Sequence, residues 1–215
     1  MFSIMTGWKM MNSKRIEEYL DLLFPDPKCE LNYNKDYELL IATVLSAQTT
    51  DKRVNEVTSI LFSKYDSLEK ISKANILDIE KIIKPLGMSN KKSEYVISIA
   101  KYLLDNCSGI VPNDEKILMS IPGVGRKTSN VVRSNLFSSS LIAVDTHVNR
   151  VSKRLNIAKE KDSVLTVEKK LMKYFPLGSL SRLHHQLVLF GRYYCTSKKP
   201  KCDGCKLKDI CSYKH

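Results

Sequence analysis

The sequence contains no uninterrupted apolar run close to the roughly 18 residues that cross a lipid bilayer. Residues Met1 to Met11 carry one lysine before Met10 and lack the long apolar core of a secretion signal. We therefore expect a cytoplasmic protein with no membrane partner. Met11 is as plausible a start as Met1, and a start at Met11 would make residues 1–10 a frayed or mis-annotated extension.

Cysteine is sparse over most of the chain, where Cys29 and Cys107 stand alone and are expected to be buried or incidental thiols. The other four lie within the last 21 residues, at Cys195, Cys202, Cys205 and Cys211. A reducing compartment disfavours disulfides, so this group indicates a metal or cluster site. Zinc is the usual metal for four cysteines. The spacing matches neither zinc ribbons nor bacterial ferredoxins, so it leaves the metal unidentified.

The alternation of apolar and polar residues that is typical of β-strands is also missing. Apolar residues recur instead at intervals of three and four, so we expect a nearly all-α fold. Asp51 is placed to cap the third helix, and Gly87 to end the fourth. One helix is predicted to end at residue 24, and another to begin directly after Gly125 and to continue through Phe137. The other predicted helices cover residues 39–48, 51–62, 76–86, 96–104, 118–121, 148–155, 164–175 and 180–193.

Acidic residues are too few to balance the basic ones. The chain has 35 Lys and Arg against 23 Asp and Glu, a formal net charge of +12. This exceeds the magnitude of about 2 to 8 that suits small soluble domains. The excess favours a polyanionic partner, such as nucleic acid or an anionic membrane face, over ordinary solubility alone.

Two glycines flank Val124 in the segment Gly123-Val124-Gly125. This arrangement allows a tight turn between two helices, and we expect all three amides of the turn to be free. Free amides at the N-terminus of the next helix bind a phosphate without recognising any base. A plain turn is the alternative, but the adjacent Arg126 and Lys127 favour the phosphate.

Lys127 and Asp145 are candidates for covalent chemistry. Lys127 lies in the first turn of the helix after the glycines, where the helix dipole and Arg126 disfavour its ammonium form. A neutral amine attacks carbonyl-like carbons, and C1′ of deoxyribose becomes one when its base departs. Asp145 precedes a helix, so it is an expected N-cap and a candidate for stabilising positive charge on the sugar or assisting proton transfer. For Lys127, a solvated lysine that touches phosphate is the alternative.

Three segments occur in order before the four cysteines: Leu45-Ser46-Ala47-Gln48-Thr49-Thr50-Asp51, Ile121-Pro122-Gly123-Val124-Gly125-Arg126-Lys127-Thr128 and Ala143-Val144-Asp145-Thr146-His147-Val148. Together they resemble the endonuclease III family of helix-hairpin-helix DNA glycosylases, from about Met11 to the C-terminus. The resemblance implies a six-helix barrel at residues 29–139, which contains the hairpin at about 115–134. It implies a second, four-helix-type domain formed by residues 1–28 and 140–215, with DNA across the domain junction.

The resemblance also implies roles for individual residues. Lys127 corresponds to the Schiff-base lysine, Asp145 to the catalytic aspartate, and Gln48 to a glutamine that fills the space left by a flipped nucleotide. The four cysteines correspond to the ligands of a [4Fe-4S] cluster. The loop between the first two cysteines corresponds to a basic loop that faces the DNA backbone through Lys198, Lys199 and Lys201. A monovalent cation site corresponds to the backbone carbonyls of Met119, Ile121 and Val124.

One segment departs from the family pattern. Relatives often show Gly-Leu-Tyr-Asn-x-Lys where this chain has Gly87-Met88-Ser89-Asn90-Lys91-Lys92, so the aromatic residue is missing. Met88 is a candidate apolar wedge at the partner strand of the lesion. The alternative for Met88 is an ordinary place in the core.

The resemblance implies a monomeric base excision repair enzyme, nucleoid-associated if bacterial, that removes oxidised pyrimidines from duplex DNA. Its abasic-site lyase activity cuts 3′ to the abasic site by β-elimination through a lysine Schiff base. A mismatch-specific monofunctional glycosylase is the second enzymatic hypothesis, against which Lys127 argues. A DNA-binding module without catalytic activity, such as a redox sensor that uses the cluster, is the third hypothesis. Only Lys127 with Asp145 argues against it.

Overall fold

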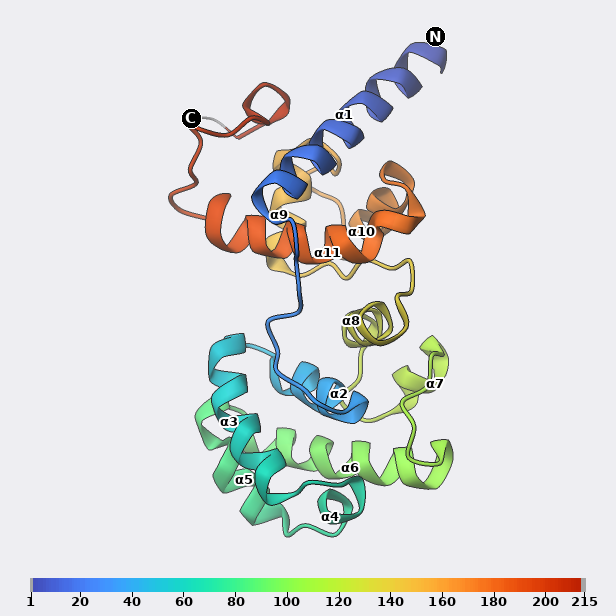
Figure 1. Cartoon of the computed structure of the whole chain (residues 1–215), viewed down its shortest axis with the longest axis vertical. Helices are drawn as coiled ribbons and strands as arrows, with labels where there is room; N and C mark the ends of the chain where they lie inside the picture. Colours follow the sequence, from blue (N-terminus) through green and yellow to red (C-terminus); the bar gives the residue numbers. More distant parts are fainter. Residues whose placement is uncertain (1, 214–215) are drawn as a thin grey trace. The chain divides into compact units, whose positions relative to one another are not determined.

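The computed structural model describes residues 2–213, with the side chains of residues 2–6, 8 and 9 left out. Within this range the chain forms helices and loops and no β-strand (Figure 1), so the all-α prediction is confirmed. None of the described helices is long and apolar enough to cross a bilayer. Residues 2–10 continue the first helix without a break, so a frayed extension is not found there; Met1 lies outside the described residues.

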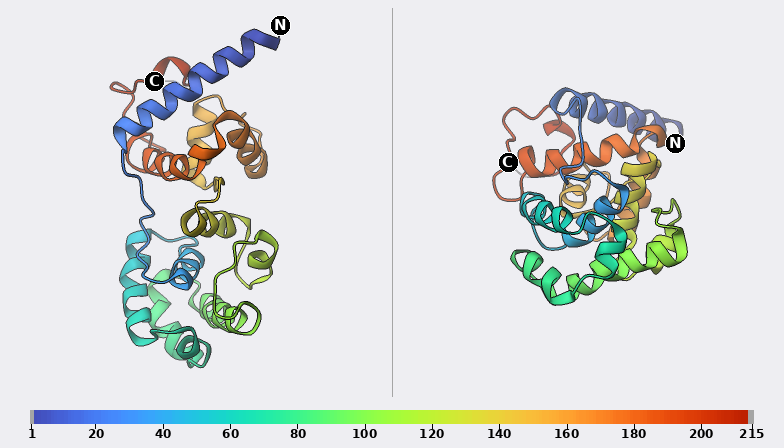
Figure 2. Two further views of the ribbon diagram at one scale, coloured as in Figure 1. Left: turned by 45° about the vertical axis from the view of Figure 1, so that its right-hand side comes forward. Right: turned by 60° about the horizontal axis from the view of Figure 1, so that its bottom comes forward.

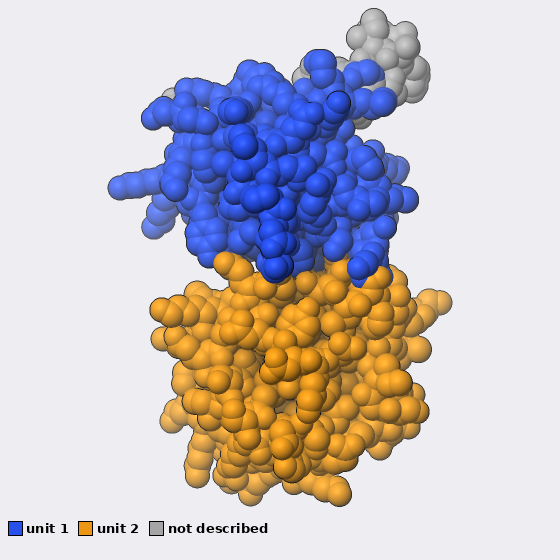
Figure 3. Space-filling view, in the orientation of Figure 1, with its two compact units in different colours: residues 1–28, 138–215 blue, residues 29–137 orange. Residues whose placement is uncertain are grey.

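The chain divides into two compact units, residues 29–137 and residues 1–28 with 138–215 (Figure 3). The second unit is therefore discontinuous in sequence. Each unit has its own hydrophobic core.

The unit of residues 29–137 is built around α2, a helix that is buried along nearly its whole length, from Tyr37 to Leu45. A helix that is buried on all sides belongs at the centre of a bundle. Accordingly, α2 packs against α3, α6 and α8, while α4 and α5 pack against α6 (Figure 2). The helices of this unit are α2 (Asp36–Leu45), α3 (Asp51–Lys64), α4 (Leu68–Ser72), α5 (Ile76–Ile83), η1 (Lys84–Leu86), α6 (Ser89–Cys107), α7 (Glu115–Ser120) and α8 (Arg126–Phe137).

The discontinuous unit packs its N-terminal helix against helices from the C-terminal third of the chain. Helix α1 contacts α10 and α11, and α9 contacts α10, α11 and the π-helix η3. The side chains of Ile16, Leu20, Val148, Leu187 and Phe190 meet in its core. The helices of this unit are α1 (Phe2–Leu23), α9 (Thr146–Arg154), α10 (Val164–Tyr174), η2 (Leu177–Ser179), α11 (Leu180–Leu189), η3 (Phe190–Tyr194) and η4 (Lys208–Ile210).

Several helix boundaries in the first unit differ from the prediction: α2 ends at Leu45 and not near Gln48, and α6 is longer at both ends than residues 96–104. Two further differences have a local cause. Thr50 rather than Asp51 caps α3, because the Thr50 side chain accepts a hydrogen bond from the amide of Arg53 at 3.4 Å. The predicted helix of residues 76–86 changes to a 3-10 helix after Ile83, where Pro85 supplies no amide for the α-helical pattern.

The helix predicted for residues 180–193 also changes character. After Leu189 it widens into the π-helix η3, whose end is marked by a hydrogen bond from the amide of Cys195 to the carbonyl of Phe190 at 2.6 Å. Helix α4 was not predicted. It spans five residues, too few for an apolar period to be visible in the sequence.

Candidate active site

A helical hairpin presents Lys127. Asp114 caps α7 by accepting the amide of Ile117 at 2.9 Å, and the turn after α7 closes with a hydrogen bond from the amide of Val124 to the carbonyl of Ile121 at 3.0 Å. Lys127 is the second residue of α8 and so lies in the first turn of that helix, as the sequence predicts. Its side chain is exposed. The expectation that all three amides of the turn are free is wrong for Val124, whose amide is used within the turn.

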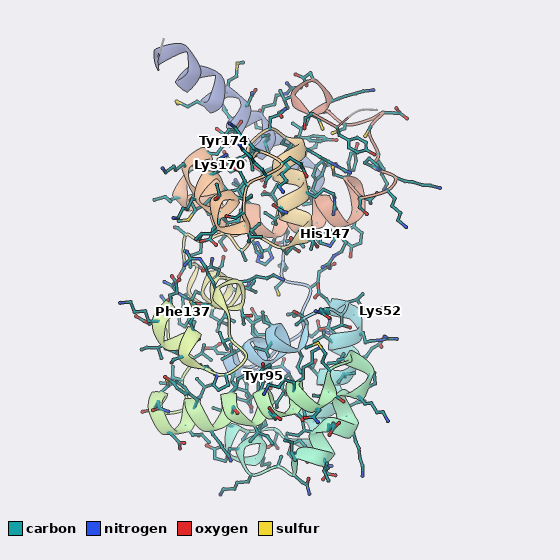
Figure 4. The ribbon with its side chains drawn as sticks, turned by 180° about the vertical axis from the view of Figure 1, so that it is seen from behind. Lys52, Tyr95, Phe137, His147, Lys170 and Tyr174 are labelled. Carbon is teal, nitrogen blue, oxygen red and sulfur yellow. The ribbon has the colours of Figure 1, made fainter. Side chains whose placement is uncertain are left out.

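The turn also requires glycine at its first position. Gly123 has a φ of +86°, and a Cβ built on it would lie 2.6 Å from Cγ of Tyr95. Tyr95 belongs to α6 and is labelled in Figure 4. The ring of Tyr95 therefore packs against the turn at Gly123. No motif in the sequence had pointed to this residue.

An ion pair joins the two helices of the hairpin at their first turns. Arg126 of α8 contacts Glu115 of α7, which also lies 3.7 Å from Arg133. The charge of Arg126 is thus partly balanced before any phosphate arrives. Among the carbonyls predicted to hold a cation, that of Ile121 already accepts the Val124 amide, and it retains a second lone pair.

Gln48 and Met88 both lie in loops of the same unit, with unusual backbone conformations. Their φ angles are 59° and 51°, and Gly87 before Met88 has a φ of 69°. Residues other than glycine rarely adopt positive φ, and such strain concentrates at functional sites. Both side chains are exposed, Met88 to 55%. A place for Met88 in the core is therefore wrong.

Asp145 caps α9, which confirms one of its two predicted roles. Its Oδ1 accepts the amide of Val148 at 2.7 Å, and its carbonyl accepts the amide of Asn149. The carboxylate is half-buried and is held in one orientation by the helix that it caps. Asp145 belongs to the discontinuous unit, whereas Lys127 belongs to the unit of residues 29–137.

Two arginines on α9 connect that helix to the start of the cysteine-rich segment. Arg150 donates to the carbonyls of Gly191 at 2.6 Å and of Cys195 at 3.1 Å. Arg154 donates to the carbonyl of Thr196 at 2.7 Å and lies 3.2 Å from Sγ of Cys195. The helix that orients Asp145 therefore also anchors the cysteine-rich segment. The predictions from sequence did not include Arg150 and Arg154, although a spacing of four residues indicates that both side chains lie on the same face of a helix.

The backbone of α9 approaches η3 closely at the same place. A Cβ built on Gly191 would lie 2.8 Å from Cβ of His147, which is labelled in Figure 4. Gly191 is therefore required for the packing of α9 against η3, and it leaves its carbonyl within reach of Arg150.

All four clustered cysteines line one cavity, together with Leu155, Phe190 and Tyr194. Each thiol is free. Burial raises the pKa of Cys205 and Cys211, and the neighbouring thiols act in the same direction. In the described part of the chain, no three potential ligand side chains converge closely enough to hold a metal ion as they stand. Four thiols around one cavity nevertheless fit a soft metal or an iron-sulfur cluster and not a hard cation.

The cysteine-rich segment is tied to the rest of its unit at both ends. At its far end, both carboxylate oxygens of Asp209 accept hydrogen bonds from Arg15 of α1 at 2.6 Å. Near its start, the amide of Lys201 donates to the carbonyl of Tyr194 at 3.0 Å. The hydrogen bond between Lys201 and Tyr194 closes the predicted basic loop, in which the side chains of Lys198, Lys199 and Lys201 are exposed.

The chain is similar in sequence and in fold to known proteins. Residues 41–177 match the model of the HhH-GPD superfamily of base excision DNA repair proteins. The chain is 44% identical to endonuclease III of Bacillus subtilis over 205 residues, which are 94% of each protein. A non-covalent complex of endonuclease III with DNA superposes with a TM-score of 0.90 at 44% identity, covering 95% of both chains. A trapped covalent intermediate of endonuclease III with DNA gives a TM-score of 0.88 at 43% identity, covering 93% of this chain and 95% of that one.

Proposed function

Because the chain belongs to the endonuclease III family of the HhH-GPD superfamily, we propose that it removes oxidised pyrimidines from duplex DNA and cuts the strand at the abasic site. It is a bifunctional DNA glycosylase and abasic-site lyase of base excision repair. Its substrate is duplex DNA that holds a damaged pyrimidine or an abasic site. It works as a monomer in the cytoplasm, at the nucleoid in a bacterial cell.

The nucleophile in this proposal is Lys127. The observation that carries it is the exposed amine in the first turn of α8, directly after the turn that Gly123 and Tyr95 shape. An endonuclease III has been trapped in a covalent complex with DNA, and such a complex requires a nucleophile from the protein. Lys127 offers a nucleophile at the N-terminal end of α8, where the helix dipole attracts the DNA phosphates.

The first covalent step exchanges one bond for another at C1′ of the sugar. The neutral amine of Lys127 bonds to C1′ while the bond from C1′ to the base breaks. The base leaves with the bonding electrons and takes up the proton that the attacking nitrogen loses. The carboxylate of Asp145 stabilises the positive charge that develops on the sugar during this exchange.

Strand cleavage follows from the same intermediate. The bond between C1′ and the ring oxygen breaks, the oxygen takes up a proton, and the nitrogen lone pair forms a protonated imine. This imine acidifies C2′. Loss of a proton from C2′ forms a double bond to C3′ and expels the 3′ phosphate, and water then hydrolyses the imine to free Lys127.

Binding in this proposal comes from two sets of residues. The first set contacts a DNA phosphate at the hairpin and consists of Arg126 and the turn of residues 123–125. The second set contacts the DNA backbone from the basic loop and consists of the exposed Lys198, Lys199 and Lys201. Gln48 and Met88 enter the duplex around the flipped nucleotide, where they replace lost stacking. The backbone carbonyls of Met119, Ile121 and Val124 would hold a monovalent cation, which would supply positive charge for a DNA phosphate.

We propose that Cys195, Cys202, Cys205 and Cys211 hold one [4Fe-4S] cluster, because all four thiols line one cavity. When bound, this cluster supplies four metal-thiolate bonds that cross-link the C-terminal segment. The basic loop between Cys195 and Cys202 is then fixed at both ends. Visible absorption of the purified protein tests the metal, because iron-sulfur clusters are coloured and zinc sites are colourless.

The variant Lys127→Gln tests the proposed reaction. On a duplex with one thymine glycol, we expect it to bind the lesion but to lose strand cleavage by more than about a hundredfold, since the nucleophile is gone. Lys116→Gln, an exposed lysine of α7, is the matched control and should cleave normally. Full cleavage by Lys127→Gln would refute the assignment. Binding without base release by the wild-type protein would favour the non-catalytic module.

A further inference from the structure

Lys92 is a lysine with an unusual location. It lies in the first turn of α6, only 2% of its surface is exposed, and it is among the largest fully buried side chains of the described chain. Lysine is almost never fully buried unless its ammonium group has partners. The proposed function gives this residue no role.

The partners of Lys92 are two backbone carbonyls from distant parts of the sequence. Its Nζ donates to the carbonyl of Ala47 at 2.9 Å and to the carbonyl of Leu86 at 3.0 Å. Ala47 follows the C-terminal end of α2, and Leu86 is the last residue of η1. A buried backbone carbonyl needs a hydrogen-bond donor, and the ammonium group of Lys92 supplies one to each of these two.

Each of these carbonyls belongs to the peptide unit that begins a strained segment. The carbonyl of Ala47 leads directly into Gln48, with a φ of 59°. The carbonyl of Leu86 leads into Gly87 and Met88, with φ angles of 69° and 51°. One ammonium group therefore fixes the orientation of the backbone immediately before both exposed side chains.

Burying the ammonium group of Lys92 costs free energy, and the need to fill space in the core does not account for a lysine at this position. Burial lowers the pKa of Lys92, which means that the surroundings disfavour its charged form. An apolar side chain of similar length would fill the same space without that cost. What an apolar side chain cannot supply is the pair of hydrogen bonds that fixes the two loops relative to each other.

We propose that Lys92 is a positioning residue that holds the loops of Gln48 and Met88 at a fixed separation, so that both side chains enter the DNA duplex together at the lesion. The inference rests on the proposed roles of Gln48 and Met88. It extends them by assigning their geometry to a side chain that does not touch DNA. Lys92 therefore serves the distortion of the duplex and not the chemistry at C1′.

The test compares two substrates for the variant Lys92→Met, which keeps the length and apolar stem of lysine but has no donor. One substrate is a duplex with a single abasic site, and the other is the same abasic strand without its complement. A single strand has no base pairs to open, so it needs no wedge. We expect kcat/KM to fall about tenfold or more on the duplex, as misplaced groups cost rate, and to change less than about twofold on the single strand.

Controls separate a positioning role from loss of folding. Lys101→Met, at an exposed site of the same helix, should leave both activities unchanged. A fall of equal size on both substrates for Lys92→Met would overturn the inference, because it would indicate general destabilisation. If Lys92→Met does not fold, Lys92→Leu, which likewise has no donor, takes its place and is judged by the same ratio of duplex to single-strand activity.

A double-mutant cycle identifies the residues through which Lys92 acts. If it acts through Gln48 and Met88, then Lys92→Met should add little to the loss caused by Gln48→Ala with Met88→Ala. Full additivity would overturn the inference. If the pair Gln48→Ala and Met88→Ala loses duplex activity but Lys92→Met does not, Lys92 has no positioning role and the proposed function stands. If the pair loses nothing, the proposed DNA contacts themselves are wrong.

Discussion

Gly123 shows how a single residue determines the shape of the candidate site. The backbone there has a φ of +86°, and the ring of Tyr95 lies where a side chain would be. Conformation and space thus both require glycine, for independent reasons. Gly125, the second glycine of the turn, has neither restriction, since no atom lies within 4 Å of its built Cβ.

This difference between the two glycines gives a prediction about stability. Gly123→Ala should destabilise the unit of residues 29–137 by more than about 1 to 2 kcal/mol, because left-handed backbone alone costs that much and the contact with Tyr95 adds to it. Gly125→Ala should cost less than about 1 kcal/mol. Chemical denaturation of both variants measures the difference. Equal effects would mean that the Tyr95 ring moves aside freely.

The two roles of Asp145 can be separated by substitution. Asparagine caps helices about as well as aspartate, so Asp145→Asn should keep the melting temperature of the wild type. Without the charge, base release should nevertheless fall by about a hundredfold or more.

Asp145→Ala should lose the cap as well, at a cost of about 0.5 to 2 kcal/mol. Thermal melting and single-turnover base release, measured on both variants, test this separation. Normal base release by Asp145→Asn would exclude an electrostatic role for the carboxylate.

At the scale of helices, the sequence is most informative where a pattern is long or a residue type is rare. Apolar residues at intervals of three and four predicted the long helices, and the position of Asp145 before one of them predicted its cap. The five residues of α4 and the change to a π-helix at Phe190 left no such pattern. Both depend on contacts with other helices, which no local sequence rule describes.

The residues that support the candidate site from behind could not be predicted from the sequence. The sequence pointed to Lys127 and Asp145 because their chemistry is distinctive next to a glycine turn or a helix start. Tyr95 and Lys92 lie three positions apart on α6, and their residue types are common in helices. Their importance comes from what the fold brings to them: the turn at Gly123 for Tyr95, and two carbonyls for Lys92.

An ion pair between Asp162, which precedes α10, and Lys170 within that helix should make stability depend on pH. Asp162 Oδ2 accepts from Lys170 at 2.5 Å and from the amide of Lys159 at 2.7 Å. The Lys170 contact first, and the amide second, lower the pKa of Asp162 from its usual 3.8. A carboxyl group with a lowered pKa in the folded state stabilises that state above its unfolded pKa. This stabilisation is lost as the pH falls through the folded pKa.

Asp162→Asn should therefore be less stable than the wild type at neutral pH, and the difference should shrink toward zero below the lowered pKa. Urea denaturation of both proteins at a series of pH values between about 7 and 2 measures this. A difference that stays constant with pH would mean that the ion pair does not contribute.

At the scale of the whole molecule, the net charge of +12 and the exposed basic loop predict how DNA affinity depends on salt. Each phosphate that the protein neutralises adds about 0.9 to the slope of log K against log salt. Replacing Lys198, Lys199 and Lys201 together by serine should reduce that slope by up to about 3.

The matched control removes the same charge elsewhere. Lys73, Lys81 and Lys101 are exposed lysines outside the proposed DNA contacts. Their triple replacement by serine should leave the slope nearly unchanged, because only lysines that meet phosphates release counterions. Equal effects of the two triple variants would show that the basic loop acts only through the total charge.

The central claim is that Lys127 becomes covalently joined to the sugar, and borohydride trapping tests it most directly. The protein is incubated with borohydride and a labelled duplex that bears one thymine glycol. Borohydride reduces an imine to a stable amine, so we predict a protein-DNA band for the wild type, a peptide containing Lys127 joined to the sugar, and no band for Lys127→Gln. A band of undiminished intensity with Lys127→Gln, or base release by the wild type without any band, would contradict the account.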